Sequence, residues 1–159
     1  MITPEILRDV DLFKDLTPAE LAKLQASARE ETYKKDETIF REKDPATKLY
    51  IILTGVVEIA RPSRPEGRTV RLLRLARGEV FGELAMLDEG VRSASAIASI
   101  VPETHIASWT FTELSALFDR DPVIGSKIHR ALARKLASRL RLTSEAVFAL
   151  LQGVLGKHL

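Results

Sequence analysis

The chain has 159 residues, of which 45% are hydrophobic and 29% charged, and its formal net charge is +2. This length and composition indicate one soluble globular domain with room for a helical appendage. The small net charge gives no indication of nucleic-acid binding by itself, although the calculated pI is near 9.0.

Cysteine is absent, which excludes disulfide bonds and thiolate chemistry and permits a reducing compartment. The N-terminus has no basic region followed by an apolar run, so no signal peptide is expected. No segment reaches the roughly 20 apolar residues that span a bilayer. We therefore expect a cytoplasmic protein with no membrane partner.

Two helix starts occupy the first thirty residues. Thr3 can cap a helix that has Pro4 at its first position, and Thr17 and Pro18 repeat the pattern. Glu20 stands where the acidic residue of a capping box belongs. The sequence therefore predicts two short N-terminal helices.

From about residue 30 the chain changes to short runs of strand-forming residues separated by turn residues. Turn signals include Gly55 and the polar stretch 62–67, which we interpret as an exposed hairpin tip. This spacing predicts a small antiparallel barrel or jelly roll. The strand-like runs occupy 32–33 and 38–40, which are separated by a turn at 35–36, and then 49–53, 56–60, 69–76, 95–100 and 104–109.

The pattern becomes helical after residue 111, with a break at Asp121 and Pro122 followed by a long helix. Six residues of this helix fall at alternating steps of four and three, as in a coiled-coil seam with one polar position. The alternative is a helix that packs only on its own barrel. We expect a homodimer through residues 136–154, with a seam of Leu136, Leu140, Thr143, Val147, Leu150 and Val154.

The stretch 81–95 combines features of a pocket for a phosphorylated sugar. Gly82 allows close backbone approach, and the short helix that follows leaves its first amide N–H groups free to face an anion. Arg92 supplies a planar cationic fork suited to phosphate, and Glu83 can accept a hydrogen bond from a sugar hydroxyl. The alternative is a strand–turn–strand corner with a surface arginine.

These elements predict an α+β fold: an antiparallel β-roll or jelly-roll barrel with short N-terminal helices, a short phosphate-binding helix and a long C-terminal helix. We assign residues 1–122 to the N-terminal helices and the β-roll. Residues 123–159 form the C-terminal helix of the same domain, as a lid and dimerisation element.

The order of these pieces resembles the cyclic nucleotide-binding domain family, and within it the sensory half of bacterial catabolite-activator-like regulators. The family's phosphate-binding cassette resembles 81–85 followed by 92–94. The resemblance spans nearly the whole chain. It also covers 13–17, 49–55, 77–79, 133–136 and 139–145.

The resemblance implies a role for each pocket residue. Arg92 and Ser93 would contact the cyclic phosphate together with backbone amides of Gly82, Leu84 and Ala85, and Glu83 would hold the ribose 2′-hydroxyl. Arg139 would pair with Glu83, and Thr143 and Ser144 would contact adenine, Ser144 from the partner subunit. Leu72 and Leu73 are expected to line the pocket or the core. Phe81 and Ala94 are expected to line the pocket.

The chain also departs from the family. Asp36 and Lys43 stand at two turn positions that usually carry glycine, which affects local loop shape more than the pocket. The activator-like proteins continue into a helix-turn-helix domain, whereas only residues 152–159 follow the seam here. No recognition helix fits in that tail, so we expect no DNA binding by this chain.

The leading hypothesis is a sensor that binds cyclic AMP and signals occupancy through its C-terminal helix to an unknown effector. Ser93 could also reach a guanine amino group, so cyclic GMP remains an alternative ligand. A second hypothesis is a degenerate module used only for dimerisation or protein contact.

A cupin-type enzyme is a third hypothesis, and it needs clustered metal ligands. His105, His129 and His158 lie in separate elements with no ligand-like pairing. We therefore expect neither catalysis, nor a metal, nor a cofactor.

Overall fold

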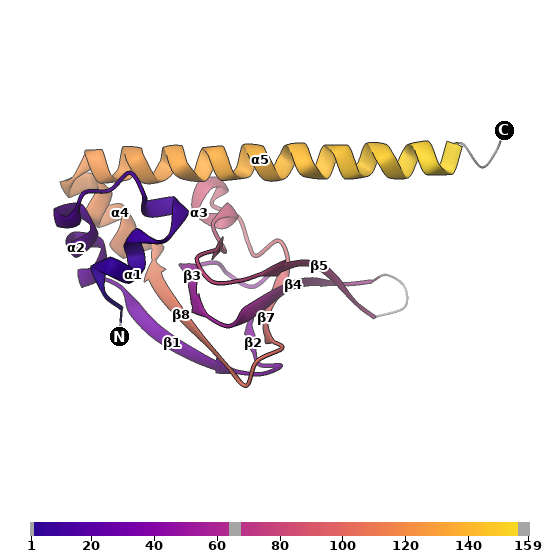
Figure 1. Ribbon diagram of the computed structural model, residues 1–159, viewed down its shortest axis with the longest axis horizontal. Helices are drawn as coiled ribbons and strands as arrows, with labels where there is room; N and C mark the ends of the chain where they lie inside the picture. The colour runs from indigo at the N-terminus through magenta and orange to yellow at the C-terminus, as the bar shows by residue number, and fades with distance from the viewer. Residues whose placement is uncertain (1, 64–67, 156–159) are drawn as a thin grey trace.

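Two four-stranded antiparallel sheets and a layer of helices build the chain (Figure 1). The computed structural model describes residues 2–63 and 68–155, so part of the predicted hairpin tip lies outside the described residues. One sheet has the order β1-β8-β3-β6 and the other β2-β7-β4-β5. The predicted β-roll is therefore confirmed. The strands are β1 Arg29–Lys34, β2 Thr38–Phe40, β3 Lys48–Thr54, β4 Val56–Pro62, β5 Thr69–Leu75, β6 Val80–Phe81, β7 Ser95–Ser99 and β8 Glu103–Thr110.

Helices α1, α2 and α4 gather at one end of the roll and α5 runs along it (Figure 1). They are α1 Pro4–Arg8, the 3-10 helix η1 Asp11–Phe13, α2 Pro18–Ala26, α3 Leu84–Asp88, α4 Phe111–Arg120 and α5 Pro122–Leu155. The capping box of α2 is formed, because Thr17 Oγ1 accepts from the Glu20 amide while the Glu20 carboxylate accepts from the Thr17 amide. Among the described residues, no helix combines the length and apolar content that crossing a membrane requires.

Strand β3 separates two hydrophobic cores because successive side chains of a strand point to opposite faces. Leu49, Ile51 and Leu53 pack against the helices, whereas Tyr50 and Ile52 fill the space between the two sheets. The helical core is completed by α2 and β8. Its fully buried members include Phe13, Leu24 and Trp109, and the indole of Trp109 donates to the Leu24 carbonyl.

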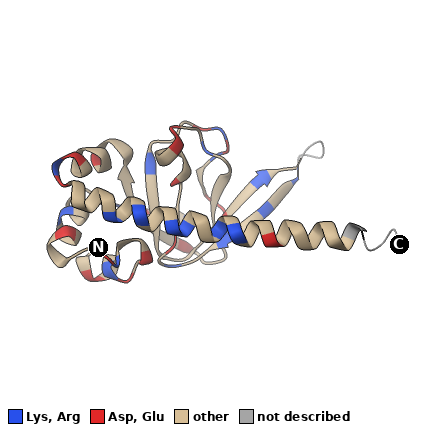
Figure 2. Ribbon diagram, turned by 90° about the horizontal axis from the view of Figure 1, so that it is seen from above, with Lys and Arg blue, Asp and Glu red and all other residues tan. Residues whose placement is uncertain are grey.

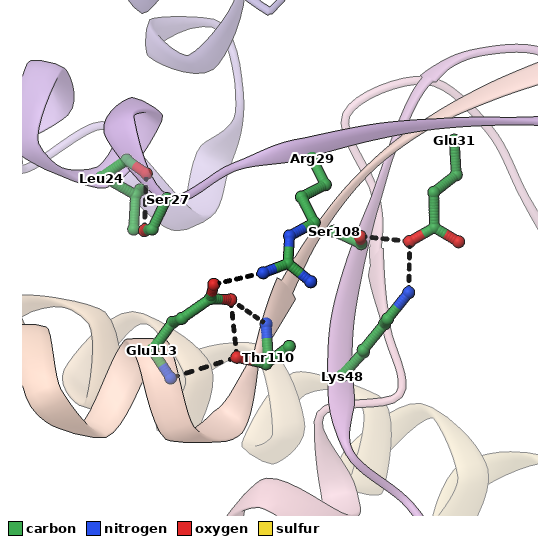
Figure 3. A network of polar contacts seen from close by, with 8 residues as sticks. All are labelled: Leu24, Ser27, Arg29, Glu31, Lys48, Ser108, Thr110 and Glu113. Atoms are coloured by element: carbon green, nitrogen blue, oxygen red, sulfur yellow. Dashed lines mark hydrogen bonds and ion pairs between the residues drawn. The ribbon is translucent and has the colours of Figure 1, made fainter.

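Two groups of polar contacts join side chains of β1, β3, β8 and the start of α4 (Figure 3). The Glu31 carboxylate accepts from Ser108 and lies 2.7 Å from the ammonium group of Lys48. Thr110 and Glu113 form the capping box of α4, and Arg29 contacts the same Glu113 carboxylate at 2.6 Å. These contacts tie β1, β3, β8 and α4 together and fix the start of β3 at Lys48.

Helix α5 runs over the roll and continues well beyond it (Figure 1). Ile124, Ile128 and Leu132, spaced by four residues, are buried against the other helices. The distal segment of α5, residues 140–153, is exposed throughout, and it is nearly free of the Lys and Arg side chains that recur earlier along the helix (Figure 2). The helix continues past Gly153 to Leu155.

Candidate functional site

Gly82 makes the turn between β6 and α3 that the rest of the site depends on. Its φ is +75°, a left-handed conformation that glycine adopts without steric cost. A Cβ atom at this position would lie 2.5 Å from Nη1 of Arg92. The turn therefore requires glycine both for its backbone and for the close approach of the arginine.

The guanidinium of Arg92 is buried directly beneath this turn, with only 4% of the residue exposed. Nη1 donates to the Gly82 carbonyl at 3.0 Å, and Nη2 donates to the Lys48 carbonyl at 2.8 Å. Nε is buried and has no hydrogen-bond partner. The contact between Lys48 and Glu31 (Figure 3) holds the strand that supplies one of these carbonyls.

Arg92 is a buried cation without a carboxylate partner. None of the ion pairs among the described residues includes it: its direct contacts are carbonyls and aromatic rings, and the carboxylates of Asp44 and Glu83 act on it only electrostatically. Burial lowers the pKa of the guanidinium, and interactions with Tyr50 partly offset this effect. An arginine nevertheless stays charged in proteins. A buried charge is costly unless it is paired, so this environment favours the arrival of an anion.

Glu83 connects the same turn to α5. The residue is only 3% exposed, and its Oε1 atom accepts a 2.6 Å hydrogen bond from Nη1 of Arg139. Nη2 of Arg139 donates to the Val80 carbonyl at 3.2 Å. The structure thus forms the ion pair between Glu83 and Arg139 that the family resemblance implied. The second carboxylate oxygen of Glu83 has no hydrogen-bond partner within the described part of the chain.

A cavity lies between this turn, the second sheet and α5. Its volume is about 500 Å³ when the open solvent at its mouth is included. Ligand sites usually measure roughly 300–1,000 Å³, so this cavity is of a size that suits a small-molecule ligand. The predicted site residues that line it are Phe81, Gly82, Glu83, Leu84, Ala85, Arg92, Ser93, Ala94, Arg139 and Leu73.

Leu72 does not line the cavity, so that prediction was wrong. Ile59 pairs with Leu73 and Ala60 pairs with Arg71, which leaves Leu72 as the extra residue of a β-bulge. Its side chain is consequently exposed, while Leu73 faces the cavity. A bulge shifts the alternation of a strand, and nothing in the run Leu72-Leu73 reveals which of the two leucines is displaced.

Thr143 and Ser144 are not brought into the cavity by this chain alone. Both residues are exposed, and their hydroxyls donate to the carbonyls of Arg139 and Leu140 at 2.9 Å. Thr143 follows Arg139 by one helical turn and so lies further along α5 than the cavity. Contact of these hydroxyls with a base therefore stays a prediction.

Four residues that line the cavity were not expected from the sequence. Three of them belong to strands. Side chains of a strand alternate between its two faces, but which face looks into the cavity is known only from the pairing of the strands. Phe40 is the most informative, because it is an aromatic residue at the end of β2. The four are Phe40, Ile59, Leu75 and Val91.

The described residues contain no cluster of three or more His, Asp or Glu side chains able to hold one metal ion. His105 lies on β8 and contacts Thr32 and nearby carboxylates, whereas His129 lies on α5 against the ring of Phe118. His158 falls outside the described residues.

Comparison with known proteins agrees with this site. Residues 30–121 match the family profile described as cyclic nucleotide-binding domain. A CRP-like cAMP-activated global transcriptional regulator of Mycobacterium tuberculosis is 30% identical over 155 residues, which cover 98% of this chain and 68% of the regulator. The chain belongs to the cyclic nucleotide-binding domain family, whose ligands are cyclic nucleotides.

Two crystal structures show the same fold. The catabolite activator protein of Thermus thermophilus has a TM-score of 0.75 and 33% identity, with 88% of this chain and 62% of that chain covered. A cyclic nucleotide-binding domain from Methylobacillus flagellatus has a TM-score of 0.78 and 28% identity, with 91% and 79% covered.

Proposed function

We propose that this chain is a regulatory sensor domain that binds cyclic AMP and signals its occupancy through α5. The observation that carries this proposal is Arg92: a buried guanidinium that lines the cavity, has no carboxylate partner and leaves Nε without a hydrogen bond. A cyclic phosphate carries one negative charge and would supply the missing partner.

The phosphate would bind at the turn between β6 and α3. Arg92 would contribute the charge, and Gly82, Leu84 and Ala85, which also line the cavity, would contribute their backbone amides. The first turn of a helix leaves N–H groups unpaired, and α3 has no side-chain cap. Ser93 lines the cavity beside Arg92 and would add a hydroxyl contact.

The ribose would bind at Glu83. Arg139 occupies Oε1 of this carboxylate and leaves Oε2 able to accept from the 2′-hydroxyl. The ligand would therefore contact a group that is bonded to α5. A ligand shifts a conformational equilibrium only through different affinities for the two states. Contact with Glu83 would provide that difference by favouring the state in which α5 lies against the roll.

The base would extend toward the open mouth of the cavity, where a second copy of the chain would complete the site. The distal segment of α5 exposes Leu140, Val147 and Leu150 on the predicted seam. Pairing of two such helices would bury these residues and bring Ser144 of one copy near the cavity of the other. The side chain of Val154 lies outside the described residues. The receiver of the signal would be a partner protein or an effector domain.

A module used only for dimerisation is the competing function, and the exposed distal segment of α5 is compatible with it. Such a module gains nothing from a buried, unpaired Arg92. Calorimetric titration with cyclic AMP, cyclic GMP and 2′-deoxy cyclic AMP, combined with light scattering, separates the two. We expect tightest binding of cyclic AMP, weaker binding of the deoxy analogue, and a dimer. A dimer that gives no heat with any of the three ligands would favour the scaffold.

A further inference from the structure

Three aromatic rings from three different elements surround the guanidinium of Arg92. Its Cζ atom lies 4.2 Å from the ring centroid of Phe40, 5.4 Å from that of Tyr50 and 6.0 Å from that of Phe111. Phe40 closes β2, Tyr50 lies in β3 and Phe111 begins α4. Of the three, only Phe40 also lines the ligand cavity.

The ring of Phe40 is itself held in place by its neighbours. It packs at 5.7 Å from Tyr50 and at 6.0 Å from Phe81, and these two rings stack on each other at 5.0 Å. The position of Phe40 is thus set by a rigid aromatic cluster between the two sheets. Arginine is a planar cation that stacks on aromatic faces. A ring that is held in place therefore also restricts the movement of the guanidinium that lies over it.

This arrangement explains how Arg92 remains buried without a carboxylate. A carboxylate in the same place would satisfy the charge and would compete with an incoming anion. An aromatic face stabilises the cation without neutralising it, and the two carbonyl acceptors occupy only the Nη atoms. The charge therefore stays without a neutralising partner in a residue that lines the cavity, and Nε–H stays without an acceptor.

We infer that Phe40 is a positioning residue, which holds the Arg92 guanidinium in place without neutralising it, so that its charge is available to the ligand. This inference rests on the proposed function for its ligand, a cyclic phosphate. The stacking geometry itself exists without ligand and is testable on its own. Phe40 acts through Arg92 and contributes no polar contact.

The first measurement is made on the chain without ligand. The Nε–Hε resonance of Arg92 in a ¹⁵N–¹H correlation spectrum is assigned by its loss in Arg92→Lys. We expect this resonance to be shifted upfield by the ring current of Phe40 and to be protected from exchange with water. Phe40→Leu should move it downfield and speed its exchange, whereas Phe40→Tyr should keep it. A resonance that does not change in Phe40→Leu overturns the stacking arrangement.

The second measurement is the affinity for cyclic AMP. Phe40→Leu should weaken binding about 3- to 30-fold, the range expected for loss of a cation–π contact, and Phe40→Tyr should restore it. Phe118→Leu serves as the matched control, since Phe118 is a half-buried ring in the other core, and it should leave the affinity unchanged. In an Arg92→Lys background the additional effect of Phe40→Leu should shrink, because lysine lacks the planar guanidinium that stacks on the ring.

The outcomes separate the two proposals. A ring-shifted Nε–Hε signal in a chain that binds no cyclic nucleotide would overturn the proposed function and leave the stacking intact. Binding that Phe40→Leu weakens equally in the wild-type and the Arg92→Lys backgrounds would overturn the positioning role, because Phe40 would then act independently of the guanidinium. Equal weakening by Phe118→Leu would also overturn it, because the effect would then be general destabilisation.

Discussion

Oε1 of Glu83 and Nη1 of Arg139 lie 2.6 Å apart and join the turn of the binding cavity to the long helix α5. Glu83 is almost fully buried, while the Arg139 side chain is 29% exposed. The second Nη atom of Arg139 bonds to the Val80 carbonyl, so one arginine bridges β6, the turn and α5. Two hydrogen bonds of Arg139 therefore link α5 to the wall of the cavity.

Arg139→Ala should lower the free energy of unfolding by about 2 kcal/mol, because it leaves the buried Glu83 carboxylate without its cation. The matched control is Arg134→Ala, which removes an exposed arginine of the same helix with a looser 3.6 Å contact to Asp15. That variant should lose less than about 0.5 kcal/mol. Urea denaturation measures both. Equal losses would show that the contact with Glu83 has no special role.

Gly82→Ala should abolish or strongly weaken cyclic AMP binding, because the new Cβ would collide with Nη1 of Arg92 at 2.5 Å. Gly78→Ala is the matched control. Gly78 also has a positive φ, +82°, but a Cβ there meets nothing within 4 Å. Both variants should lose stability through backbone strain, of about 1–2 kcal/mol. Calorimetry should find near-normal affinity for cyclic AMP in Gly78→Ala and not in Gly82→Ala. Equal losses of affinity in the two variants would contradict the role of the turn at Gly82.

Glu31 should make the fold less stable at low pH. Burial opposes its ionisation, but hydrogen bonds from Lys48, Ser108 and Tyr33 outweigh burial and hold the pKa of Glu31 below its usual range. A lowered folded-state pKa stabilises the fold above the unfolded value, about 4.3, and this stabilisation is lost as the pH falls through the folded value. Between about pH 5 and 2, the free energy of unfolding should fall less steeply with decreasing pH in Glu31→Gln than in the wild type, as measured by denaturation. An unchanged slope would exclude this contribution.

Ile100→Gly should stabilise the chain by about 0.5–1 kcal/mol, since a β-branched residue there adopts a φ of +70°. Its side chain is 49% exposed, so little burial is lost. Val101→Gly, at the next position and without a positive φ, should destabilise instead. Thermal unfolding compares the two, and a loss of stability in both variants would argue against backbone strain at Ile100.

Most elements of the fold could be predicted because their signals are local. The capping residues Thr17 and Glu20 marked a helix start, and alternating apolar runs marked the strands. Asp36 and Lys43 stand where the family usually has glycine, and both adopt a positive φ, of 66° and 70°. Both positions therefore keep the left-handed turn conformation, although it is strained for a residue with a side chain.

The parts that could not be predicted depend on contacts between distant residues. The displacement of Leu72 follows from its pairing with β4, and the approach of Phe40 to Arg92 follows from the packing of β2. Thr143 and Ser144 lie exposed on α5, and their contact with a base stays a prediction that requires a second copy of the chain.

Calorimetric titration of cyclic AMP into the wild-type chain and into Arg92→Ala tests the central claim most directly. Charged hydrogen bonds contribute about 1.5–3 kcal/mol each, so loss of the guanidinium should weaken binding by several kcal/mol. Circular dichroism should show that the variant keeps its fold. Saturable binding by the wild type and almost none by Arg92→Ala is the predicted result. Equal affinity of the two proteins would show that the phosphate does not bind at Arg92.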